Sequence, residues 1–464
     1  MNLFVDREKE RSRLEKEYRA NRSAFVVLYG RRRVGKTALI TEFIRDKNAL
    51  YFLATEESEV QNRNAFKDAA ADYLDSNLLR AARISTWNAI FEAILAQPAD
   101  SKRILILDEF QYLGKSNPAF PSIFQKIWDS QLKDSNIMVI LCGSLITMME
   151  SQTLNYSSPL YGRRTAQIKM AQIPFRYYNE FYPLMDHRDL IEHYAVTGGV
   201  PKYIELFDER TNIYEAIEEH VLETTGFLYE EPSFLLRNEV SEVGSYYSII
   251  KAIAAGNHKL SKIATVLEVP QTGLSKYLRT LIDLDILERE IPVTEENPER
   301  SKKGLYWIKD NFICFWFRFI FPYRSYLERG ETEYVMARIR KNFVDTHVSY
   351  VFEDICREKL WSLSSEGVWD FSFDRVGRWW DNVNHEIDAV AVDGSGRNLL
   401  LGECKYWAGP VGINILRELE AKANLVEWNR NNRTVWFALF SASGFTEDLQ
   451  ELAKTRTDLR LIEM

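Results

Sequence analysis

Short apolar runs alternate with amphipathic segments over the first third of the chain. The runs are long enough for buried strands, and the apolar positions between them recur at helical spacing. Because strands that alternate with helices build a parallel sheet, this pattern predicts an α/β fold. The predicted strands are 25–29, 49–54, 103–109 and 137–144.

The middle of the chain changes to a helical pattern. Residues 170–245 alternate apolar and charged positions at helical spacing, and Gly198-Gly199-Val200-Pro201 interrupts them between two helices. Three short helical segments and two strands follow, an order that predicts a winged helix-turn-helix. These elements are expected at 246–255, 260–267, 272–284, 287–293 and 304–308.

The last part of the chain returns to strand-like runs. Residues 385–392 and 398–407 are predicted to form strands joined by the turn Asp393-Gly394-Ser395-Gly396. With a helical linker before this region, the expected segments are 1–169, 170–245, 246–310, 311–337 and 338–464.

Composition is typical of a globular protein. The 464 residues suggest about three domains, and 46% hydrophobic with 27% charged residues argues against disorder. The four cysteines lack metal-ligand spacing and are expected to be buried thiols in a reducing cytosol. No secretory signal is seen, and the apolar run 312–321 contains Arg318 and is too short to span a bilayer. We therefore expect a cytoplasmic protein without a membrane partner.

A phosphate-binding loop follows the first predicted strand. Gly30–Thr37 matches G-x-x-x-x-G-K-[ST], and a helical pattern follows it. Backbone N–H groups would converge on the phosphates of ATP, Lys36 would neutralise their charge, and Thr37 would ligate Mg²⁺. The alternative is a glycine turn that binds nothing. The expected nucleotide-binding residues of this loop are Gly30, Arg31, Arg32, Arg33, Val34, Gly35, Lys36, Thr37 and Ala38.

Two later strands end in polar residues. Asp108 and Glu109 end the third predicted strand, where Asp108 would hold Mg²⁺ and Glu109 would polarise the attacking water. The alternative is that this pair caps a helix. Ser144 ends the fourth predicted strand at a position from which it would sense the γ-phosphate, unless it only forms a turn.

Six segments together resemble the archaeal-type ATPases of the STAND group, relatives of AAA+ proteins. They are residues 4–8, the arginine-rich P-loop, Leu-Asp-Glu-Phe at 107–110, Cys142-Gly143-Ser144, residues 158–164 and Thr197-Gly198-Gly199-Val200-Pro201. The resemblance implies that 170–245 is a helical lid and that Arg7 and Glu8 pack beside the adenine. It also implies that Arg163 or Arg164 approaches the γ-phosphate, in the same subunit or from a neighbouring one.

The partner of the expected winged helix stays open. Its third helix would present Gln271, Thr272, Ser275, Lys276 and Arg279 to a groove. Residues 256–304 carry eight Lys and Arg against eight Asp and Glu, and the whole chain has a net charge of −8. Duplex DNA and a protein surface are therefore both candidate partners.

A carboxylate cluster is expected on the last hairpin. A turn centred on Gly394-Ser395 would place Glu386 opposite Glu403 and Asp388 opposite Leu401. Alternation along the strands then puts the acids Glu386, Asp388 and Glu403 and the base Lys405 on one face. Such a face is costly unless it holds a divalent cation or is solvated.

This arrangement resembles the PD-(D/E)xK nucleases, which have a restriction-endonuclease-like α/β fold. The resemblance implies that Glu353, Asp388 and Glu403 bind Mg²⁺ and that Lys405 activates the attacking water. Ile387 replaces the proline that commonly precedes the Asp, and 338–464 carries 16 Lys and Arg against 20 Asp and Glu. The alternative is an amphipathic hairpin with a solvated polar face.

These observations lead to one functional hypothesis and one rival. The hypothesis is an ATP- and Mg²⁺-dependent switch that controls a Mg²⁺-dependent DNA endonuclease, with DNA and further copies of the chain as candidate partners. The rival is an ATP-controlled regulator that binds DNA or protein and whose last domain is catalytically inactive.

Overall fold

The computed structural model describes residues 4–383 and 385–464. The chain divides into two compact units. The first consists of Met1–Ile173, Gly199–Lys202 and Phe234–Ser241, and the second holds the remainder.

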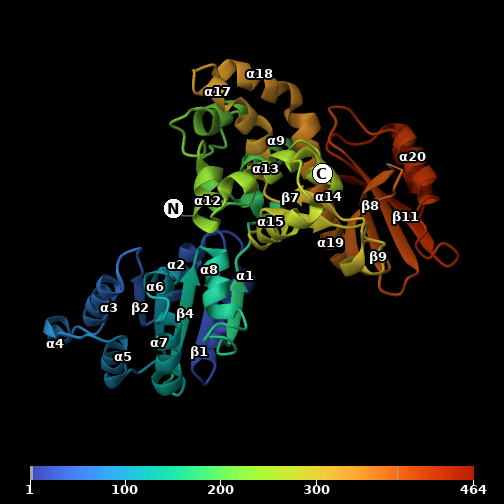
Figure 1. Cartoon of the computed structure of the whole chain (residues 1–464). Coiled ribbons are helices and arrows are strands. Elements are labelled where there is room, and N and C mark those ends of the chain that lie inside the picture. Colours follow the sequence, from blue (N-terminus) through green and yellow to red (C-terminus); the bar gives the residue numbers. More distant parts are fainter. Residues whose placement is uncertain (1–3, 384) are drawn as a thin grey trace. The chain divides into compact units, whose positions relative to one another are not determined.

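A five-stranded parallel sheet forms the centre of the first unit (Figure 1). The strand order is β2-β3-β4-β1-β5. Four strands occupy the four predicted runs, whereas β5 has only four residues of alternating burial and was not predicted. The strands are β1 (Ala24–Tyr29), β2 (Ala49–Leu53), β3 (Arg103–Asp108), β4 (Ile137–Gly143) and β5 (Ala166–Lys169).

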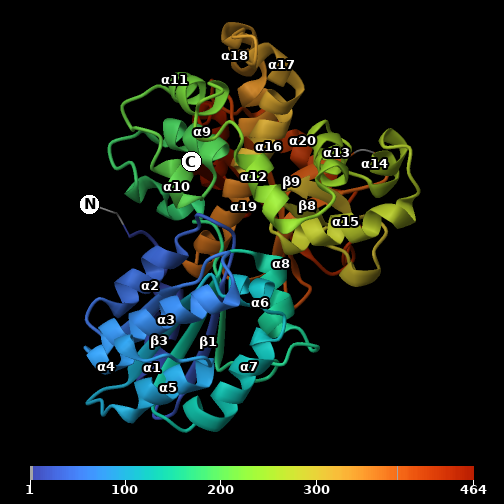
Figure 2. The same ribbon diagram turned by 60° about the vertical axis from the view of Figure 1, so that its left-hand side comes forward.

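Helices cover both faces of this sheet (Figure 2). On one face Leu14 of α1 and Leu39 of α2 pack with Val26, and on the other Phe25 packs against Phe124 of α7 and Trp128. Strand residues that alternate in direction therefore bury apolar side chains on both sides, as parallel sheets do. The helices are α1 (Glu8–Arg19), α2 (Lys36–Ile44), α3 (Glu59–Tyr73), α4 (Asn77–Ala81), α5 (Trp87–Ala96), α6 (Gln111–Ser116), α7 (Phe120–Ile127) and α8 (Ile146–Met149).

The region 174–310 is mostly helical. α9 ends at Thr197 and α10 begins at Pro201, where the glycine motif was expected to break the chain. α12 begins in the second unit and ends in the first. The five elements expected between 246 and 308 are present within three residues of their expected limits. The elements are α9 (His187–Thr197), α10 (Pro201–Ile204), α11 (Ile213–Ile217), α12 (Glu231–Glu239), α13 (Val243–Ala254), α14 (Leu260–Val266), α15 (Gln271–Asp283), β6 (Leu287–Glu290) and β7 (Leu305–Ile308).

A set of helices leads from β7 to the last sheet. The apolar run beginning at Phe312 is buried, with Trp316 and Ile320 fully inaccessible. In the part of the chain that the structure describes, no helix combines the length and apolar character needed to cross a bilayer. The helices are α16 (Asn311–Phe315), α17 (Arg324–Leu327), α18 (Thr332–Phe343) and α19 (Ser349–Ser365).

The second sheet has five strands in the order β12-β11-β10-β9-β8. β8, β9 and β10 are antiparallel, whereas β10, β11 and β12 are parallel. Residues of α20 and α21 pack with Leu401 and Leu439 in one apolar core. The elements are β8 (Phe373–Trp380), β9 (Glu386–Asp393), β10 (Asn398–Lys405), α20 (Ile413–Ala423), β11 (Thr434–Ser441), α21 (Glu447–Thr455) and β12 (Leu459–Glu463).

The register of the β9–β10 hairpin differs from the predicted one. Leu401 pairs with Val390, and the register continued towards the strand end puts Asp388 opposite Glu403. The prediction was wrong by two residues because the Asp393 carboxylate accepts hydrogen bonds from the backbone of Arg397 and Asn398, which centres the turn one residue later.

A β-bulge also changes the face on which β9 residues lie. Gly377 pairs with Val390 but Trp379 pairs with Ile387, so β9 has one extra residue between these pairs. A bulge reverses the alternation of side chains beyond it. Ile387 consequently joins the core that contains Val390. The expectation that Glu386 shares a face with Glu403 is therefore wrong.

Candidate functional site

The P-loop is built on backbone conformations that favour glycine. β1 is buried throughout and ends at Tyr29. Gly30 follows with φ 155° and Gly35 with φ 93°. A Cβ at Gly30 would also collide with the carbonyl oxygen of Met170. These two glycines let the chain turn tightly between β1 and α2, so the loop has the geometry in which N–H groups cradle phosphates.

Lys36 lies buried inside this loop. Its ammonium donates hydrogen bonds to the carbonyl oxygens of Gly30 (2.8 Å) and Arg31 (2.7 Å). Burial lowers its pKa, and the nearby carboxylates of Glu109 and Asp108 oppose that effect. Thr37, one residue on, is exposed in the first turn of α2. A buried cation beside an exposed hydroxyl is the arrangement that phosphate and Mg²⁺ binding requires.

The two acidic residues after β3 have different partners. Asp108 is buried and accepts hydrogen bonds from the Tyr51 hydroxyl and from the Glu109 N–H (2.9 Å). The Glu109 carboxylate accepts bonds from the hydroxyl (2.8 Å) and the N–H (3.2 Å) of Ser144 and from Gln111. The next helix, α6, has no side-chain cap. The helix-cap alternative for this pair is therefore wrong.

Ser144 and Glu109 meet because of the strand order. β4 lies between β1 and β3, so its end is next to both the P-loop and Asp108. The predicted phosphate-binding, Mg²⁺-binding and sensor residues thus gather at the carboxyl edge of one parallel sheet, where ligands of α/β proteins bind.

Three residues at this edge were not singled out from the sequence. Tyr51 and Gln111 orient the two acids, and Glu239 accepts hydrogen bonds from the Ile146 N–H (3.1 Å) and the Thr147 hydroxyl (3.0 Å). Glu239 is half-buried, and this desolvation raises its pKa. No sequence signal links a glutamate at the end of α12 to residues more than ninety positions earlier.

The N-terminal segment contacts the P-loop through Arg7. The Arg7 guanidinium donates to the carbonyl oxygens of Val34 (3.0 Å) and Ala171 (2.8 Å). Val5 is buried and Phe4 packs against the core beside the sheet. Arg7 therefore fixes this segment to the loop, and its role beside an adenine stays a prediction.

Arg163 and Arg164 lie near the amino-terminal ends of the parallel strands, whereas the P-loop lies at their carboxyl ends. Arg163 binds Asp129 through two hydrogen bonds (2.9 and 2.7 Å), and Thr165 bonds to Phe25 at the start of β1. The six residues of β1 separate this position from the P-loop by about 17 Å. These arginines precede β5, whereas the P-loop follows β1, and the two strands are parallel. The prediction that they approach the γ-phosphate of their own subunit is therefore wrong. A role towards a neighbouring subunit stays a prediction.

ATP and Mg²⁺ fit the residues at this edge. Their phosphate charge would meet the buried Lys36 and the α2 N-terminus, and a hard cation would meet the oxygen ligands Thr37 and Asp108. Arg31, Arg32, Arg33, Val34 and Ala38 complete the loop, in which Arg32 donates to the Tyr112 hydroxyl (2.9 Å).

The second sheet carries a separate cluster centred on Lys405. Its ammonium lies 2.8 Å from the Glu403 carboxylate and 3.5 Å from that of Asp388. Asp388 accepts a hydrogen bond from the Cys404 N–H (3.0 Å), and Lys422 of α20 also binds Glu403. Burial and the nearby Asp388 raise the pKa of Glu403. Asp388, Glu403 and Lys405 were all predicted and do converge.

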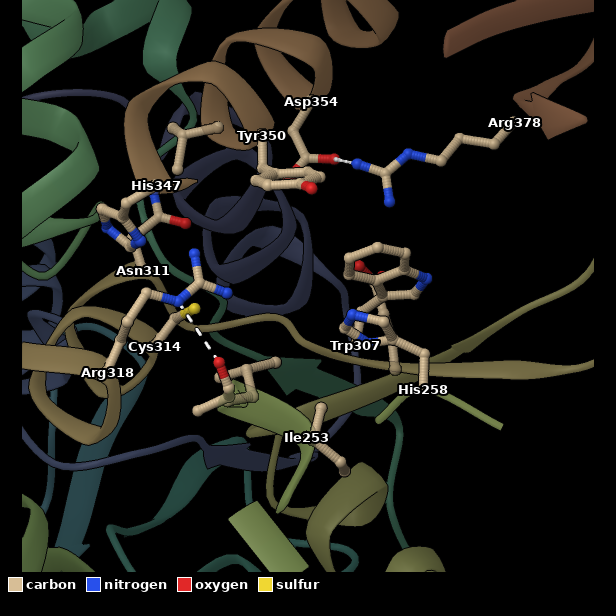
Figure 3. A pocket seen from close by; sticks show the side chains of 14 residues that line it. Ile253, His258, Trp307, Asn311, Cys314, Arg318, His347, Tyr350, Asp354 and Arg378 are labelled. Carbon is tan, nitrogen blue, oxygen red and sulfur yellow. Dashed lines mark hydrogen bonds and ion pairs between the residues drawn. The ribbon is translucent and has the colours of Figure 1, made fainter. Parts of the chain in front are cut away.

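Glu353 is paired with arginines and not with Lys405. Its carboxylate lies 2.9 Å from the Arg378 guanidinium and 3.8 Å from that of Arg357. Arg378 also reaches Glu290 (3.3 Å) and lies over the Trp307 ring, beside a cavity of about 40 Å³ (Figure 3). Burial, reinforced by Asp388, raises the pKa of Glu353 to about 8.

The chemistry of the cluster fits a hard cation at Asp388 and Glu403. Both carboxylates contact one ammonium, so both are within reach of a single positive charge, and carboxylate oxygens are the ligands that Mg²⁺ prefers. Across residues 4–383 and 385–464, no three His, Cys, Asp or Glu side chains are grouped so as to hold a metal ion. Glu353 as a third ligand therefore stays a prediction.

The cysteines carry no site of their own in this fold. All four thiols are free; three are buried and Cys314 is half-buried.

Comparison with known proteins gives matches over most of the chain. Residues 4–207 match a family described as an ATPase domain predominantly from Archaea. Residues 316–422 match a family described as archaeal and bacterial proteins of unknown function.

Individual relatives agree with these matches. The uncharacterized protein MJECL04 of Methanocaldococcus jannaschii is 34% identical over 404 residues, which are 87% of this chain and 88% of that protein. The uncharacterized ATP-binding protein MJ0423 of the same organism is 47% identical over 45 residues, 10% of this chain and 76% of that one. The solved Walker-type ATPase PABY2304 of Pyrococcus abyssi has a TM-score of 0.50 at 19% identity, covering 68% of this chain and 96% of its own. The P-loop geometry and these matches together show that the chain belongs to the family of P-loop ATPases found predominantly in Archaea.

Proposed function

We propose that this ATPase is a STAND-type switch whose last domain cleaves nucleic acid with the help of Mg²⁺. The observation that carries the proposal is the contact of the Lys405 ammonium with both Asp388 and Glu403. Two acids and one lysine that converge on a strand end are suited to metal-assisted phosphodiester hydrolysis. The ATPase family accounts for the first unit but gives no reason for this second cluster.

The residues at the edge of the first sheet divide the work of ATP hydrolysis. Lys36 would neutralise phosphate charge, and Thr37 and Asp108 would hold Mg²⁺, which supplies further charge neutralisation when bound. Glu109 would polarise the attacking water. Its carboxylate is oriented for this role by the hydrogen bonds from Ser144, so that it need not reorganise during the reaction.

Glu239 offers a link from the ATP site to the rest of the chain. It accepts hydrogen bonds from residues 146 and 147, which directly follow Ser144. α12, which ends at Glu239, begins with residues of the second unit. A change at Ser144 on hydrolysis would therefore alter the packing of a helix that continues into the other unit, as a switch requires.

The elements α13, α14, α15, β6 and β7 support the assignment of a winged helix. Three helices are followed by an antiparallel two-stranded sheet. The α15 residues Gln271, Thr272, Ser275 and Lys276 are exposed, as a recognition surface must be. Arg279, on the same helix, pairs with Asp283 (3.3 Å).

The element order of the last domain supports a nuclease-like assignment. α19, three antiparallel strands, α20 and β11 follow one another, in the order of the restriction-endonuclease-like fold that the sequence resembles. Asp388 and Glu403 would hold Mg²⁺, which supplies a Lewis acid when bound. Lys405 would position the attacking water.

A plasmid-cleavage assay tests the proposal. The wild type should convert supercoiled plasmid to nicked or linear forms with Mg²⁺ or Mn²⁺, and Lys405→Ala should not. Lys454→Ala is the matched control, because Lys454 is exposed on α21 and pairs only with Glu451 among the described residues. Cleavage that survives in Lys405→Ala would contradict the proposal.

A specific observation favours the rival, a regulator with an inactive last domain. Glu353 is bound by two arginines and Glu403 by two lysines, so the acids are already neutralised by side chains. Under this alternative the wild type would bind DNA or a protein in an ATP-dependent way and would cleave nothing with either metal.

A further inference from the structure

A basic groove lies within the second unit, and none of Asp388, Glu403 and Lys405 lines it. Its volume is about 520 Å³. One wall is the wing, which we define as β6, β7 and the loop between them. The other walls are the starts of α14 and α15 and the end of β8 at 380–382. The groove therefore has residues of the winged-helix segment on one side and of the last domain on the other.

Positive charge dominates this groove. Its lining contains four cations and one carboxylate, namely Lys259, Arg289, Lys302, Lys303 and Asp381. Lys303 pairs with Glu295 (3.0 Å), but within residues 4–383 and 385–464 neither Lys259 nor Lys302 forms an ion pair. On a protein with a net charge of −8, such a local excess of cations indicates a site for an anionic ligand.

The single carboxylate of the groove is held by its own neighbours. Asp381 accepts hydrogen bonds from the backbone N–H groups of Val383 (2.8 Å) and His385 (3.0 Å) and contacts the His385 ring (2.6 Å). Although slight burial opposes them, these donors lower the pKa of Asp381 to about 2. The Asp381 carboxylate is thus hydrogen-bonded within its own segment, and the four cations give the groove a net positive charge.

The walls are fixed to one another by hydrogen bonds. The Val293 N–H donates to the Arg378 carbonyl (2.9 Å), and the Trp380 indole donates to the Lys303 carbonyl (3.2 Å). Arg289 donates to Ser301 (2.6 Å), and its guanidinium lies where a Cβ at Gly304 would be. The wing, with Arg289 held against it, is therefore fixed relative to the end of β8 before any ligand binds, which lowers the entropic cost of binding.

The groove borders the strand that carries Asp388. Trp380, which lines the groove, pairs with Glu386, the first residue of β9. Asp388 lies two residues farther, about 7 Å along a strand. A nucleic-acid strand bound among the groove cations would therefore lie next to the strand that carries Asp388.

We propose that this groove binds the phosphate backbone of a single nucleic-acid strand and leads that strand to Asp388 and Glu403. That the strand leads to Asp388 and Glu403 rests on the proposed nuclease function, but binding in the groove does not require cleavage. Lys259, Arg289, Lys302 and Lys303 would contact phosphates, and Tyr306 at the wall offers a ring for base stacking.

Fluorescence anisotropy of the full chain with a labelled single-stranded oligonucleotide in EDTA tests this site. The Lys259→Ala/Lys302→Ala variant should bind at least tenfold more weakly than the wild type. Two lost phosphate contacts should also reduce the slope of log affinity against log salt by about 1.4. Both lysines are exposed, so folding should be retained, and thermal melting checks this.

The matched control is Lys341→Ala/Lys454→Ala, which removes two exposed lysines outside the groove and outside the winged-helix segment. It should stay within threefold of the wild type. Equal losses in both variants, or wild-type binding by the groove variant, would overturn the inference. A duplex oligonucleotide should bind more weakly than the single strand, and inorganic phosphate at the same phosphate concentration should compete poorly; equal competition would mean a simple anion site.

Separate experimental outcomes would contradict the groove proposal and the nuclease proposal. Asp388→Asn should abolish cleavage but should bind the oligonucleotide in EDTA at least as tightly as the wild type, because a carboxylate that repels phosphate is lost. If the wild type binds through the groove but never cleaves, the nuclease proposal fails and the groove stands. If it cleaves while the groove variant binds normally, the groove is wrong.

Discussion

The Arg378 guanidinium lies 2.9 Å from the Glu353 carboxylate and joins it to Glu290 of the wing at 3.3 Å. The Arg378 side chain is 3% exposed, so this bridge is screened little by water. It connects α19, β6 and β8, the elements on which the winged-helix segment and the last domain meet. Loss of this bridge should therefore lower the stability of the folded protein.

At pH 9, where Glu353 is ionised, replacing Arg378 with methionine should lower the free energy of unfolding by about 3 kcal/mol, because the two carboxylates that it joins lose their cation. Urea denaturation measures this. Adding Glu353→Gln should recover at least about 1 kcal/mol, since one uncompensated charge is removed. Arg279→Met, at an ion pair whose arginine is 80% exposed, is the control and should cost less than about 1 kcal/mol. A similar loss of stability in Arg378→Met and Arg279→Met would contradict a stabilising role for the bridge.

Glu353 should make stability depend on pH. Burial raises its folded pKa from 4.5 to about 8, so between these values the folded state holds a proton that the unfolded state releases. Its contribution to stability is thus complete below pH 4.5 and is lost as pH rises through 8. Between pH 5 and pH 8.5 the stability of Glu353→Gln relative to wild type should improve by at least about 1 kcal/mol. Glu451→Gln, at an exposed site, should show no such change in the same urea titrations.

Lys36 should be required for nucleotide binding. Its ammonium is buried in the P-loop, and within the described part of the chain its hydrogen bonds go to two carbonyl oxygens that phosphate oxygens would replace. Lys36→Ala should weaken ATP binding at least tenfold, about 1.4 kcal/mol. Calorimetry measures this, with Lys47→Ala on the same unit as the control, because Lys47 pairs with Glu15 away from the loop. Unchanged affinity in Lys36→Ala would exclude the loop as the site.

Much of this ATP site could be predicted from the sequence because its parts are local. The P-loop, Asp108 and Ser144 each end a buried strand, and a parallel sheet brings strand ends to one edge. The contribution of Glu239 depends on where α12 returns in space, which no periodicity encodes. The same-subunit role of Arg163 was wrong because its motif does not reveal that it precedes a strand, β5, and so lies at the other end of the parallel strands.

The carboxylate cluster was predicted in composition but not in geometry. Asp388, Glu403 and Lys405 converge as expected, because a register error of two residues preserves the alternation of side chains. The bulge on β9 was not predictable, since no glycine or proline marks it. It moved Glu386 off the face of Glu403, and Arg378, absent from the sequence argument, took Glu353 as its partner.

Ser144 and Glu109 should separate hydrolysis from binding. Glu109→Gln keeps the shape of the side chain but cannot polarise water, so turnover should fall about 10²-fold or more while ATP still binds. Ser144→Ala removes the 2.8 Å hydroxyl bond to Glu109 and should reduce turnover about tenfold. Ser151→Ala, whose hydroxyl bonds only to a nearby carbonyl among the described atoms, is the control for phosphate release. Unaltered turnover in Glu109→Gln would assign the base to another residue.

Lys405 should oppose metal binding and support cleavage. Its ammonium lies between Asp388 and Glu403, where a divalent cation would have to compete with it. Lys405→Ala should therefore bind Mn²⁺ as tightly as the wild type or more tightly, seen as an equal or larger rise of the melting temperature with added Mn²⁺. Asp388→Asn should abolish that rise, because a hard cation loses one of its two anionic ligands.

Lys422→Ala, which removes the other lysine on Glu403, should also strengthen metal binding but leave cleavage measurable. This difference separates a lysine that acts on the attacking water from one that only balances charge. If Mn²⁺ stabilises none of these proteins, the two acids and Lys405 form a salt-bridged structural cluster, and the last domain acts without metal chemistry.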